Sequence, residues 1–260
     1  MKNTVREKML RGEKTLGTFM ELGSANVMEC LAASGLDYVI LDTEHGPFSP
    51  EGAADLLRAA ENRGLTVYVR IGSVQRPDVL RMLDVGARGL VVPNIRSVQQ
   101  VRELVDHAKF PPLGRRGYCP TRTSAWGADG WAADAAAYME ECNRRVRVIP
   151  QCETCEALEH IEEIAALPGV DAVFIGPCDL SIDMGIPLQF ENPQLISAVR
   201  RVIAACHANG KECLIFAGNL KDAAKWLDLG ADSIAYSLDA ALLTAAFRKT
   251  VEDFRALGGA

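Results

Sequence analysis

Four segments of the sequence place polar side chains directly after short apolar runs, and their residue types suit acid–base or metal chemistry. They are DTEHGP at 42–47, Arg70, QCET at 151–154 and GPCDLS at 176–181. If the apolar runs are strands of one parallel barrel, their carboxyl ends share one rim, where the active sites of such barrels form. We therefore expect the four segments to converge at the mouth of the barrel.

Glu153 and Asp179 are the candidate metal ligands. Two hard carboxylates suit Mg²⁺, Mn²⁺ or a similar octahedral cation that keeps water or substrate oxygens in its other positions. Gln151 alternates with Glu153, so both side chains face the same side of an extended chain. The alternative is that the two carboxylates form salt bridges with Arg70.

His45 is the only one of the four histidines at a predicted strand end. Asp42 precedes it by three residues, and a carboxylate there could orient the imidazole and raise its basicity for proton transfer. The alternative is that His45 only supports the site or packs in the core.

Arg70 closes the run TVYVR. An arginine buried at a barrel mouth needs an anionic partner, and a substrate carboxylate or enolate bound through two hydrogen bonds would supply one. A structural ion pair of Arg70 with Asp42 or Glu44 is the alternative.

The lysines restrict the mechanism. None of the eight lies at the carboxyl end of a predicted strand, where an aldolase that forms a Schiff base needs one. If the protein is an aldolase, a metal must therefore act as the electron sink. The sequence also lacks G-x-x-x-x-G-K, which argues against phosphoryl transfer from ATP.

Apolar runs alternate with longer helical stretches from one end of the chain to the other. Continuous apolar runs are typical of strands buried on both faces, and they cover 16–20, 38–42, 66–70, 89–92, 147–151, 172–176, 212–216 and 233–236. Helices are predicted over 25–34, 50–63, 77–85, 97–108, 134–144, 155–166, 193–209, 219–229 and 239–257.

Eight strand–helix repeats in 260 residues predict a single (β/α)₈ TIM barrel over residues 1–260. An open doubly wound sheet would require a G-x-G-x-x-G turn, which is absent. A loop as long as the irregular stretch 110–134 is usually functional or disordered, and its Trp126 and Trp131 favour an ordered lid.

Composition narrows the partners and the compartment. The net charge of −6 argues against a nucleic-acid partner, and no 18-residue apolar run suggests a membrane span. The charged start MKNTVREKML does not resemble a secretory signal. The eight cysteines, including the pair Cys152 and Cys155, are therefore expected to be free thiols of a cytoplasmic protein.

In order and spacing, the motifs resemble those of the HpcH/HpaI aldolase family, the metal-dependent pyruvate aldolases that include 4-hydroxy-2-oxoheptanedioate aldolase and 2-keto-3-deoxy-sugar-acid aldolases. The likeness runs over nearly the whole chain. The matching segments are LGTF at 16–19, DTEHGP at 42–47, Arg70, GRRG at 114–117, QCET at 151–154 and IGPCDLS at 175–181.

The resemblance implies reversible cleavage of a 4-hydroxy-2-oxo acid to pyruvate and an aldehyde, in the breakdown of aromatic compounds or sugar acids. Glu153 and Asp179 would hold Mg²⁺, Mn²⁺ or Co²⁺. Arg70 would stabilise the enolate oxygen, and His45, oriented by Asp42, would handle the proton of the aldol hydroxyl. The residues that bind substrate would be Arg70, Gln151, Gly176 and Cys178, with the backbone amides of 176–179 on the pyruvate carboxylate.

The resemblance also implies dimers that exchange the last helix and assemble into hexamers. The apolar residues Ala240, Leu242, Leu243 and Phe247 are compatible with such an exchange. Two features depart from the family pattern: the segment 116–120 is more polar and bulkier than expected, and Cys178 replaces a smaller residue. Both bear on which aldehyde the enzyme accepts.

Two other functions stay open at this point. An acyl-CoA lyase of the malyl-CoA or citramalyl-CoA type is the first, although it would want an extended basic surface for the CoA phosphates. A non-catalytic barrel that binds small acids is the second.

Overall fold

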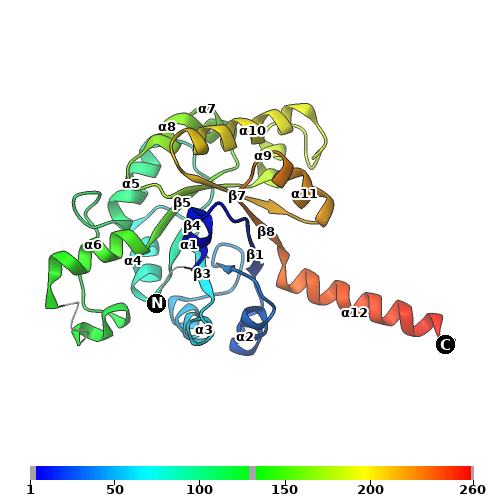
Figure 1. The fold of residues 1–260 in the computed structure, drawn as a ribbon, viewed down its shortest axis with the longest axis horizontal. Helices are drawn as coiled ribbons and strands as arrows, with labels where there is room; N and C mark the ends of the chain where they lie inside the picture. The colour runs from blue at the N-terminus through cyan, green and yellow to red at the C-terminus, as the bar shows by residue number, and fades with distance from the viewer. Residues whose placement is uncertain (1–3, 129–132, 259–260) are drawn as a thin grey trace.

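A computed structural model describes residues 4–128 and 133–258 of the chain (Figure 1). Eight parallel strands form a closed barrel in sequence order, and β1 pairs with both β2 and β8. The strands are β1 (Thr15–Met20), β2 (Tyr38–Asp42), β3 (Thr66–Arg70), β4 (Gly89–Val92), β5 (Arg147–Cys152), β6 (Ala172–Ile175), β7 (Glu212–Ala217) and β8 (Ser233–Leu238). The predicted (β/α)₈ barrel is confirmed.

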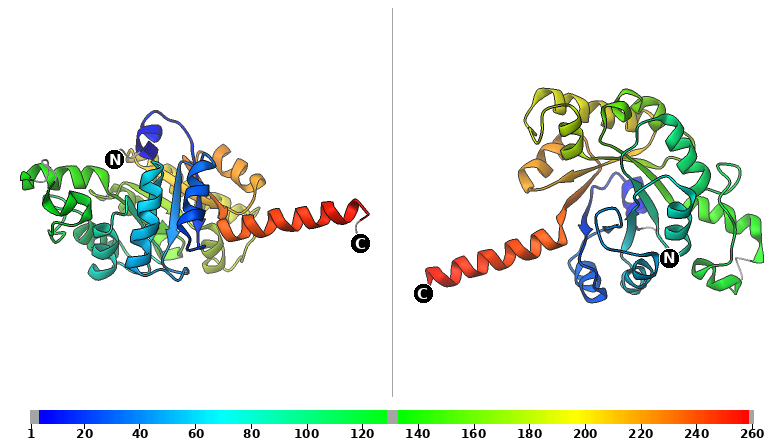
Figure 2. Two further views of the ribbon diagram at one scale, coloured as in Figure 1. Left: turned by 90° about the horizontal axis from the view of Figure 1, so that it is seen from below. Right: turned by 180° about the vertical axis from the view of Figure 1, so that it is seen from behind.

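Helices follow the strands and surround the barrel (Figures 1 and 2). They are α1 (Thr4–Leu10), α2 (Ala25–Ala33), α3 (Pro50–Asn62), α4 (Arg76–Asp84), α5 (Val98–Ala108), α6 (Ala135–Arg145), α7 (Cys155–Glu159), α8 (Ile161–Ala166), α9 (Pro177–Asp183), α10 (Pro193–Ala208), α11 (Leu220–Asp228) and α12 (Asp239–Ala256), with a 3₁₀ helix η1 (Arg122–Gly127).

Capping residues in the sequence set where several helices begin. The Ser49 side chain accepts a hydrogen bond from the amide of Gly52, and Pro50 occupies the first turn of α3. Ser97 and Asn219 cap α5 and α11 in the same way. Gly64 follows α3 with a positive φ of 74°, a conformation that other residues adopt only with strain.

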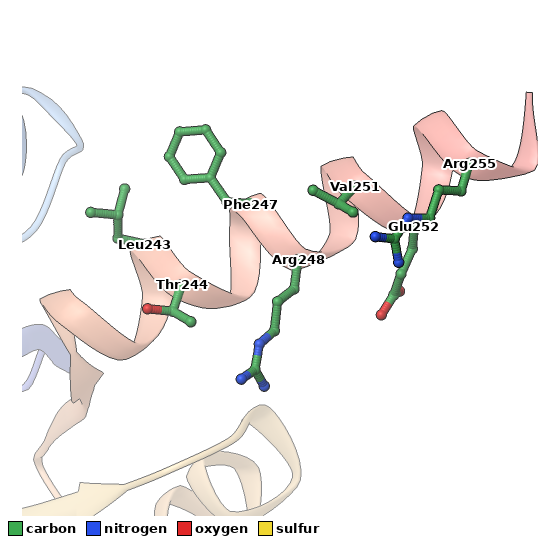
Figure 3. Close-up of a pocket in the computed structure, with 7 residues that line it drawn as sticks. All are labelled: Leu243, Thr244, Phe247, Arg248, Val251, Glu252 and Arg255. Atoms are coloured by element: carbon green, nitrogen blue, oxygen red, sulfur yellow. The ribbon is translucent and has the colours of Figure 1, made fainter. Parts of the chain in front are cut away.

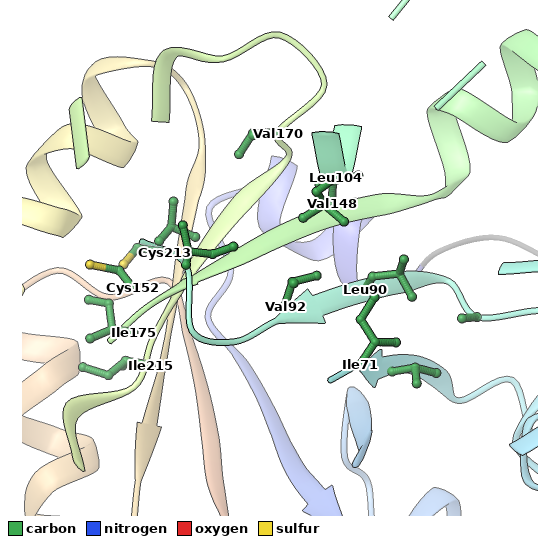
Figure 4. Close-up of a cluster of buried hydrophobic side chains, with 14 of the residues drawn as sticks. Ile71, Leu90, Val92, Leu104, Val148, Cys152, Val170, Ile175, Cys213 and Ile215 are labelled. Atoms are coloured by element: carbon green, nitrogen blue, oxygen red, sulfur yellow. The ribbon is translucent and has the colours of Figure 1, made fainter. Parts of the chain in front are cut away.

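Two apolar cores lie on either side of the barrel wall. Because side chains alternate along a strand, Leu214 of β7 packs inside the barrel, whereas Cys213 and Ile215 face the helices. Figure 4 shows part of the outer core. Helix α1 closes the amino-terminal end of the barrel, since its Val5 and Met9 pack with the interior residues.

The structure differs from the predicted helices in three places. Helices α1 and α9 were not predicted. The helix predicted over 155–166 is divided into α7 and α8 at His160, whose backbone is not helical. Ala157 of α7 and Ile161 of α8 both pack in the outer core.

The described part of the stretch 110–134, for which the sequence favoured an ordered lid, lies along the outside of the barrel. Arg116 forms an ion pair with Asp84 at the end of α4, and Arg122 forms one with Glu61 at the end of α3. Arg122 also donates to the carbonyl of Val85. These partners lie near the amino-terminal ends of β3 and β4, so ion pairs hold the segment on the side opposite the barrel mouth. Trp131 lies outside the described residues.

Helix α12 projects away from the barrel, and its far end contacts no other element in any view (Figures 1 and 2). Its apolar side chains are therefore exposed, and Phe247 keeps 65% of its surface. Among the described residues, no helix combines the length and the apolar character that crossing a membrane requires.

Truncation of Leu214 to alanine tests the barrel interior. We expect Leu214→Ala to lower the free energy of unfolding by about 2–5 kcal/mol, because it leaves a cavity among close-packed side chains. Leu220→Ala is the control, since Leu220 is exposed at the start of α11 and its loss should cost within about 0.5 kcal/mol. Chemical denaturation of both variants measures the difference, and equal effects would contradict the placement of Leu214.

Candidate active site

The barrel mouth collects the side chains that continue the inward-facing rows of the strands. Phe19, Ile40, Tyr68, Ile149 and Phe174 point into the barrel. Alternation along each strand therefore directs the residue two positions later toward the mouth. These residues are Glu21, Asp42, Arg70, Gln151 and Gly176.

Two adjoining cavities open at the mouth. We call the first the apolar cavity; it has a volume of about 210 Å³ and is lined by Phe19, Glu21, His45, Arg70, Gln151, Phe174, Gly176, Pro177, Cys178, Asp179, Phe216 and Leu238. We call the second the polar cavity; it has a volume of about 310 Å³ and is lined by Glu44, His45, Arg70, Asn94, Arg96, Glu153, Thr154, Asp179, Ile182 and Asp183. His45, Arg70 and Asp179 line both, so the two cavities form one site.

Asp42 and Arg70 bind each other at the ends of two adjacent strands. They are direct partners in the register of β2 and β3. Arg70 Nε donates to Asp42 Oδ1 at 2.9 Å, and Nη2 donates to Oδ2. Burial opposes the ionisation of Asp42, but the hydrogen bonds and charge of Arg70 outweigh it, so the pKa of this carboxyl lies below its usual value.

His45 stands at the junction of the cavities, but its imidazole does not contact the Asp42 carboxylate as the sequence predicted. Asp42 Oδ1 instead accepts hydrogen bonds from the backbone amides of Glu44 and His45. The imidazole is 68% exposed, and its Nε2 lies 3.8 Å from Glu44 Oε2. Through these amides Asp42 positions the loop that carries His45. Its carboxylate pairs with Arg70 rather than with the imidazole.

Glu153 is held by donors on both of its oxygens. Oε1 accepts from the amide of Asn94 at 2.6 Å, and Oε2 accepts from Gln151 Nε2. Asn94 has a positive φ of 51°, a conformation that asparagine tolerates better than most residues. Burial, together with the nearby charges of Asp179 and Glu44, raises the pKa of Glu153 to about 7.

The residues around Glu153 fit a hard divalent cation. Glu153 and Asp179 line the same cavity, and the ion pairs of Arg70 go to Asp42 and Glu44. The two candidate ligands are therefore left unneutralised by the arginine. A cation would relieve the repulsion that disfavours the charge of Glu153.

The surroundings leave room and hydrogen-bonding capacity for ligands other than these two carboxylates. Among the described residues, no group of three or more His, Cys, Asp or Glu side chains converges at one point, so water or substrate oxygens would complete the shell. Gln151 Oε1 is buried and has no partner among these residues. A Cβ atom on Gly176 would lie 2.6 Å from Glu153 Oε2, so only glycine permits this arrangement.

Comparison with known proteins identifies the family. The family model described as HpcH/HpaI aldolase/citrate lyase matches residues 15–246. The chain belongs to this family. Membership makes it a carbon–carbon lyase of the aldolase type, as the sequence predicted.

Curated relatives cover nearly the whole length of this HpcH/HpaI chain. A hydroxypyruvate/pyruvate aldolase from Sagittula stellata is 33% identical over 96% of this chain and 98% of its own. A 4-hydroxy-2-oxo-heptane-1,7-dioate aldolase from Escherichia coli is 31% identical over 95% of this chain and 92% of its own.

A solved structure shows the same architecture. A protein of the HpcH/HpaI family from Burkholderia cenocepacia has a TM-score of 0.90 and 32% sequence identity, covering 98% of this chain and all of its own.

Several residues of this HpcH/HpaI site were not predicted from the sequence. The aromatic wall of Phe19, Phe174 and Phe216 lies inside apolar runs and carries no polar signal. Glu21 follows β1 in the same register as Phe19, and that alternation could have revealed it. Asn94 and Arg96 follow β4, a strand end for which the sequence suggested no role.

Replacement of Asp42 by asparagine tests the ion pair. We expect Asp42→Asn to lower the free energy of unfolding at neutral pH by about 3 kcal/mol, because Arg70 loses its principal counter-charge where it is only 12% exposed.

The effect should also depend on pH. The folded-state pKa of Asp42 is depressed, so its ionised form stabilises the fold above the unfolded pKa of about 4, and this contribution disappears as the pH falls through the folded value. Denaturation midpoints measured from about pH 7 down to about pH 3 should therefore converge for wild type and Asp42→Asn. A difference that stays constant over this range would contradict the ion pair.

Proposed function

We propose that the chain is a divalent-metal-dependent aldolase that reversibly cleaves a 4-hydroxy-2-oxo acid to pyruvate and an aldehyde. The observation that carries the proposal is the pair Glu153 and Asp179 in one cavity beside Arg70. The curated relatives are named as aldolases of hydroxypyruvate and pyruvate or of 4-hydroxy-2-oxo acids, and these names support the substrate class.

Glu153 and Asp179 would hold Mg²⁺, Mn²⁺ or Co²⁺. When bound, such a cation polarises a keto oxygen and stabilises negative charge on it. Gln151 and the Asn94 amide orient Glu153 for this task. The amides of Cys178 and Asp179 lie in the first turn of α9, where they have no partner within the helix and can bind the substrate carboxylate.

The remaining groups of the site move the proton and bind the enolate. His45 takes the proton of the 4-hydroxyl group as general base. The carbon–oxygen bond at C4 then becomes the aldehyde carbonyl, and the electron pair of the C3–C4 bond passes to C3 and the 2-oxo oxygen. Among the described residues, ion pairs engage Nε and Nη2 of Arg70, which leaves Nη1 for the enolate oxygen. Protonation at C3 completes pyruvate.

Removal of metal tests the mechanism. We expect EDTA to lower pyruvate release from 4-hydroxy-2-oxo acids by about 100-fold or more, and Mg²⁺, Mn²⁺ or Co²⁺ to restore it. Glu153→Gln should weaken the binding of Mn²⁺ in calorimetry, whereas Glu140→Gln on the exposed face of α6 should bind normally. Undiminished activity of the metal-stripped protein would refute the metal role. Preferential turnover of a CoA thioester would instead favour the acyl-CoA lyase.

We propose further that the chain forms dimers that exchange α12 and assemble into hexamers, in a reducing cytoplasm. All eight cysteines are free thiols, which is consistent with the proposed reducing compartment. Leu243, Phe247 and Val251 recur every four residues and form an exposed apolar stripe along α12 (Figure 3). A helix with an exposed apolar stripe is stable in water only when another surface covers that stripe, and a second copy of the chain is the proposed cover.

A charge in the apolar stripe tests the assembly. Wild-type protein should have a mass in solution that is a multiple of the 28.2 kDa chain. We expect Phe247→Asp to shift the mass, measured by light scattering after gel filtration, toward a single chain, because a carboxylate would be buried without a partner. Ala245→Asp, on the opposite and exposed face of the same helix, is the matched control. A monomeric wild type would contradict the proposal.

A further inference from the structure

The apolar cavity has a wall that cannot hydrogen-bond to a substrate. The Phe19 ring packs edge-on against Phe174 and Phe216, with centroids 5.8 Å and 6.0 Å away. Leu238 completes the wall, and the Arg70 guanidinium lies over Phe19 at 4.7 Å. Such a wall favours the alkyl part of a substrate, because burying it removes apolar surface from water on both sides.

Glu21 lines the same cavity and comes from the end of β1. It lies two residues after Phe19 and therefore faces the same side of the chain. Its backbone amide donates to Asp239 Oδ1 at 2.9 Å, so the residue is anchored to the start of α12. Arg70, the arginine of this cavity, forms ion pairs with Asp42 and Glu44. The Glu21 carboxylate is therefore left to interact with a bound substrate.

The charges around the two cavities have the same sign as Glu21. Five carboxylates line them, namely Glu21, Glu44, Glu153, Asp179 and Asp183, against the two arginines Arg70 and Arg96. Arg96 is bound to Glu156 at 2.9 Å. A bound divalent cation and the negatively charged pyruvate would together add one positive charge, which is less than the surplus of three carboxylates over arginines, so the mouth keeps a negative potential. This potential opposes an aldehyde that carries its own carboxylate.

We propose that Glu21 determines the specificity for the aldehyde. Glu21 selects uncharged aldehydes whose short alkyl stem lies on the wall formed by Phe19, Phe174 and Phe216. A hydroxyl group of such an aldehyde donates a hydrogen bond to the Glu21 carboxylate. Glu21 rejects aldehydes that end in a carboxylate. This inference rests on the proposed aldolase function, since it concerns the second substrate of that reaction.

Two matched pairs of aldehydes test the charge and the hydrogen bond separately. The first pair is butanal and 4-oxobutanoate, which differ in the terminal charge. We expect wild type to favour butanal in kcat/KM for addition to pyruvate, and Glu21→Gln to lower this preference by about tenfold, because the amide keeps the shape and removes the charge.

The second pair is propanal and 3-hydroxypropanal. We expect Glu21→Ala to lose the preference for the hydroxylated aldehyde by about tenfold, since a hydrogen bond to a charged group is lost. Glu140→Gln is the control for both pairs and should keep both ratios. Because each ratio compares two substrates of one variant, differences in the active fraction of the preparations cancel.

Hydrogen–deuterium exchange at the pyruvate methyl group separates this inference from the function on which it rests. Enolisation of pyruvate in D₂O needs no aldehyde, and NMR measures it directly. No exchange in wild type with Mg²⁺, Mn²⁺ or Co²⁺ present would overturn the aldolase proposal, and this inference with it. Exchange in wild type together with unchanged aldehyde ratios in Glu21→Gln and Glu21→Ala would overturn the role of Glu21 alone.

Discussion

The ion pair between Asp42 and Arg70 joins the carboxyl ends of β2 and β3, and the rest of the site depends on it. Because Asp42 is completely buried, its charge is tolerable only with a counter-charge and several donors, and Arg70 and the loop amides supply both. The pair occupies the arginine, so Arg70 forms no ion pair with Glu153 or Asp179 and both carboxyl groups are left for a cation. It also fixes the loop that carries His45.

The alternation of side chains along the strands divides the mouth into two halves of different chemistry. The inward row that ends in Glu153 contributes to the polar half, where charge is concentrated and partly desolvated. Inward rows that end in Phe216 and Glu21 give the apolar half with one acid on its rim. An aldol cleavage needs this division, because the enolate requires charge stabilisation and the departing aldehyde requires a shaped pocket.

Helix α12 connects the barrel mouth to the surface proposed for assembly. It begins at the mouth, where Asp239 accepts hydrogen bonds from the amides of Glu21 and Leu22, and it then leaves the barrel. A surface that covers its apolar stripe would therefore act on an element that is anchored beside the apolar cavity. The proposed assembly and the proposed recognition of the aldehyde would share this one stretch of chain.

Local patterns in the sequence predict all eight strands and most of the helices. Buried strands such as Tyr38–Asp42 read as continuous apolar runs, and caps such as Ser49 mark helix starts, because both signals are local. Since the carboxyl ends of the strands meet at one rim, the convergence of Arg70, Glu153 and Asp179 could also be predicted.

Which partners these side chains bind depends on contacts between distant parts of the chain. The register of β2 and β3 sets Asp42 against Arg70 rather than against the imidazole of His45. Contacts with α3 and α4 hold the segment around Arg122 away from the mouth. The register between strands and the closure of the barrel bring together residues that are far apart in the chain. A local sequence pattern therefore cannot predict which of them become partners.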